Sequence, residues 1–276
     1  MKHKKSMAAL LLMTLALSAC GATTAVTPTP PGTGTGTTPP DTTPPAPTPT
    51  PTPPATKGSI TGRVVNEQGQ PLKGVEIDAG NTQFSNSDLL TTTDANGLYK
   101  LDVTAMATTW HVTAHQKLKY NGYTIAVDLV PDGNDVLPGL EGGVLNFTFK
   151  PKVITPEDPY GNLGMVMLDE MNGEFDIDWA NVQLTLTPVG PLADGTSGPA
   201  RTLHLSQTNS GWIVPNVMWG TYTVSATMNG QPLELRRRAM GVHDYPWSTT
   251  YTGGFYVDYS LLQPNMFLEA RLPQSN

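Results

Sequence analysis

The sequence predicts an all-β protein in which two tandem Greek-key β-sandwiches follow a disordered stalk. Two observations lead to this prediction. Residues 21–57 hold 14 threonines and 12 prolines, a composition that cannot bury enough apolar surface to offset the entropy of ordering. After Lys57, short runs in which apolar and polar residues alternate are separated by turn sequences rich in Gly, Pro, Asn and Asp.

The first 19 residues have the three parts of an export signal. Lys2, Lys4 and Lys5 precede an apolar stretch from Met7 to Leu17, and small residues follow it. This stretch is shorter than the roughly 20 residues that a membrane-spanning helix needs. We therefore predict that residues 1–19 form a signal peptide and no membrane anchor.

Cys20 is the only cysteine, so it forms no disulfide within the chain. The run Leu17-Ser18-Ala19-Cys20-Gly21 resembles the lipobox of bacterial lipoproteins. The resemblance implies that Cys20 becomes the first mature residue and carries a covalent lipid such as palmitate. It also implies export to the outer membrane or cell surface, since Gly21 is not acidic. The alternative is an ordinary secretory signal with a chance cysteine at its end.

Removal of residues 1–19 takes three of the 16 basic residues and none of the 23 acidic ones, which leaves a charge of 13 − 23 = −10. A repulsive acidic surface excludes nucleic acid as the main partner. The run Arg236-Arg237-Arg238 is predicted to be a solvated strand edge.

We predict that residues 20–57 form a linker that begins with the lipidated Cys20 and is rich in Pro and Thr. Prolines favour the extended polyproline II conformation, at about 3.1 Å per residue. Fully extended, the stalk reaches on the order of 100 Å, enough to hold a domain away from a lipid surface.

Residues 58–152 are predicted to form the first sandwich. Ile60, Gly62 and Val64 alternate before the turn Gly69-Gln70-Pro71-Leu72, and Tyr99 begins another alternating run after the turn Thr93-Asp94-Ala95-Asn96-Gly97. These motifs resemble the carboxypeptidase regulatory-like domain, which implies a transthyretin-type (prealbumin-like) sandwich. The closing strand is expected at Leu145, Phe147 and Phe149.

Residues 153–161 are expected to link this domain to a second, divergent sandwich at residues 162–276. Thr208-Asn209-Ser210-Gly211 echoes the turn at Asp94–Gly97, and the last strand is expected from Met266 to Leu272. Asn229-Gly230 predicts a two-residue hairpin turn, because both residue types tolerate positive φ.

No motif for catalysis is present in this sequence. It has no His-Glu-x-x-His zinc motif and no Gly-x-Ser-x-Gly nucleophile elbow, and its one cysteine is assigned to the lipid. We predict that the protein is not an enzyme and needs no cofactor other than the lipid.

Metal binding is a distant alternative. Copper or zinc, with a superoxide dismutase-like activity, would need histidines that meet in space; the candidates are His111, His115, His204 and His243. As a strand would place His111 and His115 roughly 13 Å apart, these two alone do not suffice. Calcium would use oxygen ligands, either Asp132, Asn134 and Asp135 on a loop or Glu174, Asp176 and Asp178 on one strand face.

Aromatic residues are concentrated near the C-terminus, at Tyr245, Trp247, Tyr251, Phe255, Tyr256 and Tyr259. A single strand would turn five of the six toward the core. A hairpin at Gly253-Gly254 would instead place Thr252 opposite Phe255 and expose one set of rings. Exposed rings would indicate a sugar-stacking platform or a protein-binding patch.

Two functions follow from these features. We favour a lipid-anchored envelope protein whose sandwiches dock onto a protein assembly, for example an S-layer or outer-membrane complex, because sandwiches offer edges and flat faces for protein contacts. The alternative is a module that binds peptidoglycan or a surface polysaccharide through exposed aromatic residues.

Overall fold

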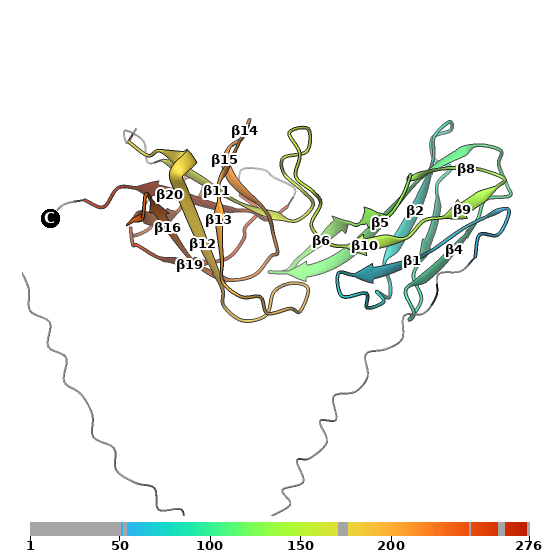
Figure 1. Ribbon diagram of the computed structural model, residues 1–276, viewed down its shortest axis with the longest axis horizontal. Coiled ribbons are helices and arrows are strands. Elements are labelled where there is room, and N and C mark those ends of the chain that lie inside the picture. The colour runs from blue at the N-terminus through green and yellow to red at the C-terminus, as the bar shows by residue number, and fades with distance from the viewer. Residues whose placement is uncertain (1–50, 52–53, 171–175, 243, 259–262, 275–276) are drawn as a thin grey trace, which may run out of the picture. The chain divides into compact units, whose positions relative to one another are not determined.

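The computed structural model describes residues 51, 54–170, 176–242, 244–258 and 263–274 (Figure 1). The signal region, Cys20 and nearly all of the stalk lie outside the described residues, so these predictions stay predictions. The described residues all belong to a compact unit that spans residues 48–276. Within them, no helix has the length and apolarity needed to cross a membrane.

The first half of this unit consists of short strands joined by turns. Its strands are β1 (Ser59–Asn66), β2 (Glu76–Asn81), β3 (Leu89–Thr92), β4 (Leu98–Asp102), β5 (Thr109–Tyr120), β6 (Tyr123–Asp128), β7 (Val130–Pro131), β8 (Val136–Pro138), β9 (Gly142–Val144) and β10 (Phe147–Phe149). They form one sheet in the order β4-β1-β10-β7, with β9 also on β1, and another in the order β3-β2-β5-β6, with β8 also on β5.

The two sheets enclose a hydrophobic core made by alternate residues of each strand. Buried side chains of this core include Ile60, Ile77, Tyr99, Trp110 and Phe147. The predicted alternation is confirmed, since Tyr99, Leu101 and Val103 are buried while Lys100 and Asp102 are exposed. The closing strand is also confirmed: β10 lies parallel to β1.

The second half contains another pair of sheets. Its elements are β11 (Gly164–Glu170), a short 3-10 helix (Trp179–Asn181), β12 (Val182–Pro188), β13 (Arg201–His204), β14 (Ser206–Thr208), β15 (Gly211–Val217), β16 (Tyr222–Met228), β17 (Gln231–Pro232), β18 (Glu234–Arg237), β19 (Tyr251–Gly253) and β20 (Met266–Arg271). The sheet orders are β14-β15-β11-β20-β18 and β13-β12-β16-β17, with β19 also on β16. The all-β prediction of two tandem sandwiches is confirmed.

The two sandwiches repeat one topology. In each, the first strand is antiparallel to a later strand and parallel to the closing strand: β1 with β4 and β10, and β11 with β15 and β20. In each, the second strand lies between two antiparallel neighbours: β2 between β3 and β5, and β12 between β13 and β16. The internal repeat inferred from the turn sequences is therefore present in the strand pairing.

The Asn-Gly hairpin has the predicted geometry. Met228 pairs with Gln231, and φ is 51° at Asn229 and 79° at Gly230. Positive φ at both central residues matches the right-handed twist of the flanking strands.

A glycine sits at the same place in the first strand of each sandwich. The parallel pair begins two residues after it in both cases, at Val64 opposite Phe147 and at Val166 opposite Met266. A Cβ on Gly62 would lie 1.8 Å from the carbonyl oxygen of Leu145, and a Cβ on Gly164 would lie 2.9 Å from that of Val217. The absence of a side chain lets neighbouring backbone approach the first strand closely.

We predict that Gly62→Ala lowers the free energy of unfolding by about 1–3 kcal/mol, because the added methyl group overlaps backbone that cannot move aside. Urea denaturation measures the change. Gly80→Ala in β2 is the matched control, since the nearest atom to its Cβ would be 3.7 Å away. Equal losses of unfolding free energy in the two variants would show that replacing any glycine in a strand has this cost. The close approach of backbone to Gly62 would then not be the cause.

Candidate functional site

The aromatic segment adopts neither of the two predicted arrangements. Ser248 pairs with Leu235 of β18, Tyr251–Gly253 forms β19 against β16, and Tyr256 pairs with Asn265 just before β20. The segment therefore passes from one sheet of the second sandwich to the other and back. The single-strand and the Gly253-Gly254 hairpin predictions were both wrong, because each assumed that the segment stays in one sheet. Tyr259 lies outside the described residues.

Among the aromatic residues of this segment that the structure describes, only Phe255 is fully buried. Its ring meets Tyr120 and Tyr222 nearly edge-on, with centroid separations of 6.3 and 6.1 Å. Its backbone N–H donates to the hydroxyl of Tyr120 at 2.9 Å, and that hydroxyl donates to the carbonyl of Gly220 at 3.1 Å. Phe255 thus anchors the segment to the core.

Two reciprocal ion pairs link β18 to β20. Glu234 lies opposite Arg271 and Arg236 lies opposite Glu269 in the strand register. The N–O distances are 2.7 Å for the first pair and 2.6 Å for the second, and the four side chains are only 16–22% exposed. The prediction of a solvated edge at Arg236-Arg237-Arg238 was half right: β18 is the last strand of its sheet, with only the bridge from Ser248 beyond it, but its arginines are largely covered.

Trp247 lies over this pair of ion pairs. The guanidinium carbons of Arg236 and Arg271 are 4.4 and 4.5 Å from the centre of its ring. Arg236 and Arg271 project from the same face of the sheet, and both contact the indole. We call Glu234, Arg236, Trp247, Glu269 and Arg271 the tryptophan platform. Trp247 is partly exposed, and its cation–π contacts with the two arginines fix the orientation of its ring.

A second cation–aromatic cluster lies on the opposite face of β18. The guanidinium carbon of Arg237 is 3.7 Å from the ring centre of Tyr256 and 5.5 Å from that of Tyr245. Its Nη2 donates to Asp258 at 3.0 Å. Arg237 lies two residues after the buried Leu235, so its side chain is on the core side of β18. Its guanidinium group lies at one end of the core.

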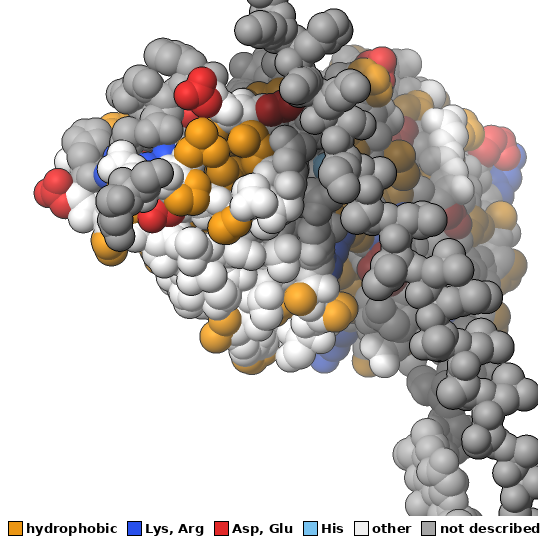
Figure 2. All heavy atoms as spheres, turned by 60° about the vertical axis from the view of Figure 1, so that its left-hand side comes forward, with side chains coloured by type: hydrophobic (Ala, Val, Ile, Leu, Met, Phe, Trp, Pro, Cys, Tyr) orange, Lys and Arg blue, Asp and Glu red, His pale blue; other side chains and the backbone are white. Residues whose placement is uncertain are grey.

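Exposed apolar side chains occur in the same stretch of sequence. Met240, Val242 and Val257 are 63%, 44% and 37% exposed. Figure 2 brings forward the side of the molecule that lies to the left in Figure 1, and hydrophobic side chains there gather beside charged ones. Such a mixture of apolar, aromatic and arginine side chains is typical of the centre of protein interfaces.

The predicted metal ligands lie in separate pairs. His111 is 3.3 Å from Asp135, His115 is 2.9 Å from Asp128, and His204 contacts Gln183 at 3.4 Å. Asp132 accepts hydrogen bonds from Asn146, and Asn134 bonds the backbone of Val136. Across the described ranges, no three His, Cys, Asp or Glu side chains are grouped to hold a metal.

The second calcium candidate was placed on a strand, and the described part of it is not one. Asp176 and Asp178 precede the short 3-10 helix, and Asp178 accepts a hydrogen bond from Asn181 at 2.7 Å. Glu174 and His243 lie outside the described residues. Metal binding stays a prediction without further support.

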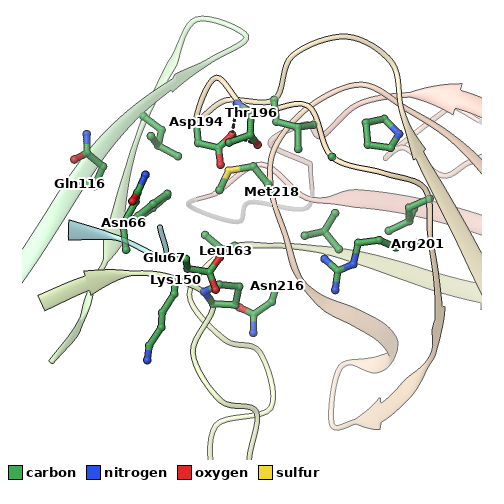
Figure 3. A pocket seen from close by; sticks show the side chains of 18 of the residues that line it. Asn66, Glu67, Gln116, Lys150, Leu163, Asp194, Thr196, Arg201, Asn216 and Met218 are labelled. Atoms are coloured by element: carbon green, nitrogen blue, oxygen red, sulfur yellow. Dashed lines mark hydrogen bonds between the residues drawn. The ribbon is translucent and has the colours of Figure 1, made fainter. Parts of the chain in front are cut away.

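A cavity of about 490 Å³ is a feature that sequence reasoning missed (Figure 3). Its wall is largely apolar, with Leu163, Met218 and Tyr222 among the lining residues, and it carries the charged residues Glu67, Lys150, Asp194 and Arg201. The charged residues come from the turn after β1, the loop after β10, the loop after β12, and β13, and the three apolar ones lie just before β11, just after β15 and at the start of β16. No local sequence pattern connects segments that far apart, so only the tertiary structure could reveal the cavity.

No protein-family model matches this chain, and no curated protein matches it. Among solved structures, the Bacillus anthracis TIE protein is 14% identical with a TM-score of 0.30, over 79% of this chain and 34% of that one. A C-terminal fragment of the pilus adhesin SpaC from Lactobacillus rhamnosus GG is 13% identical with a TM-score of 0.24, over 80% and 100%. A B repeat unit of the collagen-binding surface protein of Staphylococcus aureus is 13% identical with a TM-score of 0.21, over 79% and 100%. Likenesses this distant carry no argument about function.

We predict that the arginines and Trp247 stabilise each other. A double-mutant cycle between Arg271→Gln and Trp247→Ala should give a coupling free energy of about 0.5–2 kcal/mol. Urea denaturation of the two single variants and the double variant measures it. The same cycle between Arg201→Gln and Trp247→Ala is the control, because β13 belongs to the other sheet. A coupling free energy of zero in the first cycle would mean that the contact between Arg271 and Trp247 contributes nothing to stability.

The pH dependence of stability tests the burial of Tyr251. Burial raises the pKa of its hydroxyl to about 12. In the unfolded chain tyrosine ionises near pH 10, so the folded state favours the neutral phenol. This contribution is complete below about pH 10 and is lost as the pH rises toward 12. We expect Tyr251→Phe to reduce the fall in unfolding free energy between pH 9 and 11.5, approximately the interval in which tyrosine ionises. A pH dependence equal to that of the wild type would contradict the burial of this hydroxyl.

Proposed function

We propose that this chain is a non-catalytic cell-envelope protein, anchored by a lipid on Cys20, that docks onto a surface or outer-membrane protein assembly through the tryptophan platform. The observation that carries this proposal is the rigid and partly exposed Trp247, fixed by two guanidinium groups that are themselves ion-paired. Trp, Tyr and Arg are the residue types that contribute most binding energy in protein interfaces.

The way in which the two arginines hold Trp247 favours a role in binding a partner over a purely structural role. A side chain that is already immobile loses little conformational entropy when a partner covers it. The four charges of the platform neutralise one another in pairs, so a partner need not bring a compensating charge. Val242 and Val257 add exposed apolar surface that would be buried from water when a partner binds.

The predicted anchor and stalk suit this role. A lipid on Cys20 would confine the chain to a membrane surface, and the Pro/Thr-rich residues would let the sandwiches reach a partner on the order of 100 Å away. The membrane and the partner would therefore not have to come closer together for docking.

Cross-linking in intact envelopes tests the proposal. We expect the full-length chain to be recovered in a cross-linked complex, and Trp247→Ala and Met240→Glu each to reduce that recovery by about tenfold, since loss of a central aromatic contact costs 2 kcal/mol or more. Met240 is 63% exposed, so its replacement does not threaten folding. Leu140→Glu, at a 45% exposed site in the first sandwich, is the matched control and should have no effect.

Recovery of wild-type chain only as a free monomer would contradict docking. A Cys20→Ser variant separates the two parts of the proposal: it should abolish membrane retention and leave binding of the partner by the soluble chain unchanged.

Glycan binding is a second candidate, favoured by one observation. Trp247 is partly exposed, and an indole can stack on a sugar ring. Pull-down with peptidoglycan and surface polysaccharide should then succeed for wild type and Trp247→Tyr and fail for Trp247→Ala. Equal binding by all three would exclude the platform as a sugar site.

A further inference from the structure

Strand β3 forms an open edge of the first sandwich. It pairs with β2 and stands last in the sheet order β3-β2-β5-β6. Thr93, just after β3, donates its N–H to the carbonyl of Val75 at 3.0 Å. Since antiparallel strands alternate in the direction of their backbone groups, Thr91 and Leu89 also face β2. The N–H and C=O groups of Leu90 and Thr92 therefore point away from the sheet.

This edge has neither the proline nor the basic residue that several other edge strands carry. Strands β7, β8 and β17 contain proline, β4 contains Lys100, and β13 contains Arg201. Proline and charged residues discourage a further strand from pairing. In contrast, β3 reads Leu-Leu-Thr-Thr, and its most exposed side chain is Leu90, at 66%. Phe84, 58% exposed, lies in the loop that leads into it.

The sheet face beside the edge is acidic. Asp78 lies opposite Leu90 in the register of β2 and β3. Its Oδ1 is buried and, within the part of the chain that the structure describes, has no hydrogen-bond partner. Burial raises the pKa of Asp78, and the negative charge of Asp88 raises it further. His115 and His111 lower the pKa of Asp78, but its buried Oδ1 accepts no hydrogen bond within the described residues, whereas neighbouring Glu76 is paired with Lys117 at 2.8 Å.

We propose that β3 binds an extended polypeptide segment of a partner protein, which adds to the sheet as a further strand and carries an apolar residue flanked by Lys or Arg. The partner's backbone pairs with the outward groups of Leu90 and Thr92. Its apolar side chain covers Leu90, and its basic side chain reaches across β3 toward Asp78. A basic residue next to the apolar one on the same face lies two strand spacings across from Asp78, about 9.6 Å, and two residues along, about 6.8 Å. The Cα atoms are then about 12 Å apart, a separation that an extended basic side chain and a carboxylate span together.

The charges favour such a partner over a second copy of this chain. Two β3 edges brought together would place Asp78 and Asp88 near the same acids of the other copy, within chains that each carry a formal charge of −7. Like charges across an interface oppose association, while a basic segment is attracted.

The test uses the full chain and a fluorescein-labelled seven-residue peptide, Thr-Lys-Thr-Val-Thr-Lys-Thr. We expect fluorescence anisotropy to detect binding, and hydrogen exchange to show new protection at the amides of Leu90 and Thr92. A peptide with Glu in place of Lys, and one that is N-methylated on the pairing edge, should each bind about tenfold more weakly or not at all.

Matched variants locate the contact. Leu90→Lys should weaken binding by about tenfold, since it places a charge on the edge, and Leu140→Lys should change it by less than about twofold. Binding by the N-methylated peptide as strong as by the parent would overturn the proposal, as would equal effects of the two lysine variants. Dimers of the free chain that Leu90→Lys abolishes would show self-pairing instead. Trp247→Ala should leave peptide binding unchanged, so this test and that of the tryptophan platform fail independently.

Discussion

Parallel pairing between the first and last strands of each sandwich is the constraint on which the rest of the structure depends. With one cysteine in the chain, neither sandwich has an internal disulfide, so hydrophobic packing must hold its ends together. The contact of β1 with β10, and of β11 with β20, joins residues about 80–100 positions apart. Gly62 makes the closure of the first sandwich feasible, because the backbone of Leu145, which leads into β10, passes where a side chain would otherwise stand.

Closure also explains where the tryptophan platform lies. As β20 is held against β11 on one side, its other edge is free to pair with β18, and that pairing brings Glu234 opposite Arg271 and Arg236 opposite Glu269. The first sandwich has β7 at the corresponding place, a two-residue strand that contains a proline. One topology therefore supports different surfaces: a charged and aromatic face in the second sandwich and an open, uncharged edge at β3 in the first.

Local patterns predicted much of the fold and little of the candidate site. The turns at Asp94–Gly97 and Asn229-Gly230, and the alternation around Tyr99, depend on neighbours in sequence and were confirmed. The aromatic segment was not predictable in the same way. Its odd spacing fits one strand, yet Ser248, Tyr251 and Tyr256 pair with three different partners in two sheets. Periodicity describes which face a residue takes within a strand, and it does not reveal where a chain leaves one sheet for another.

The sequence by itself determined the fold class, the repeat and the predicted address of this protein, because composition, alternation and turn chemistry act over a few residues. Tertiary structure alone decided how Arg236 and Trp247 are used. Read in sequence, an arginine triplet suggests a solvated edge; in the fold, cross-strand carboxylates neutralise Arg236 and Arg271, and an indole 11 residues from Arg236 covers them both. Ion pairing and stacking of this kind depend on strand register, which is set by the packing of the whole sandwich.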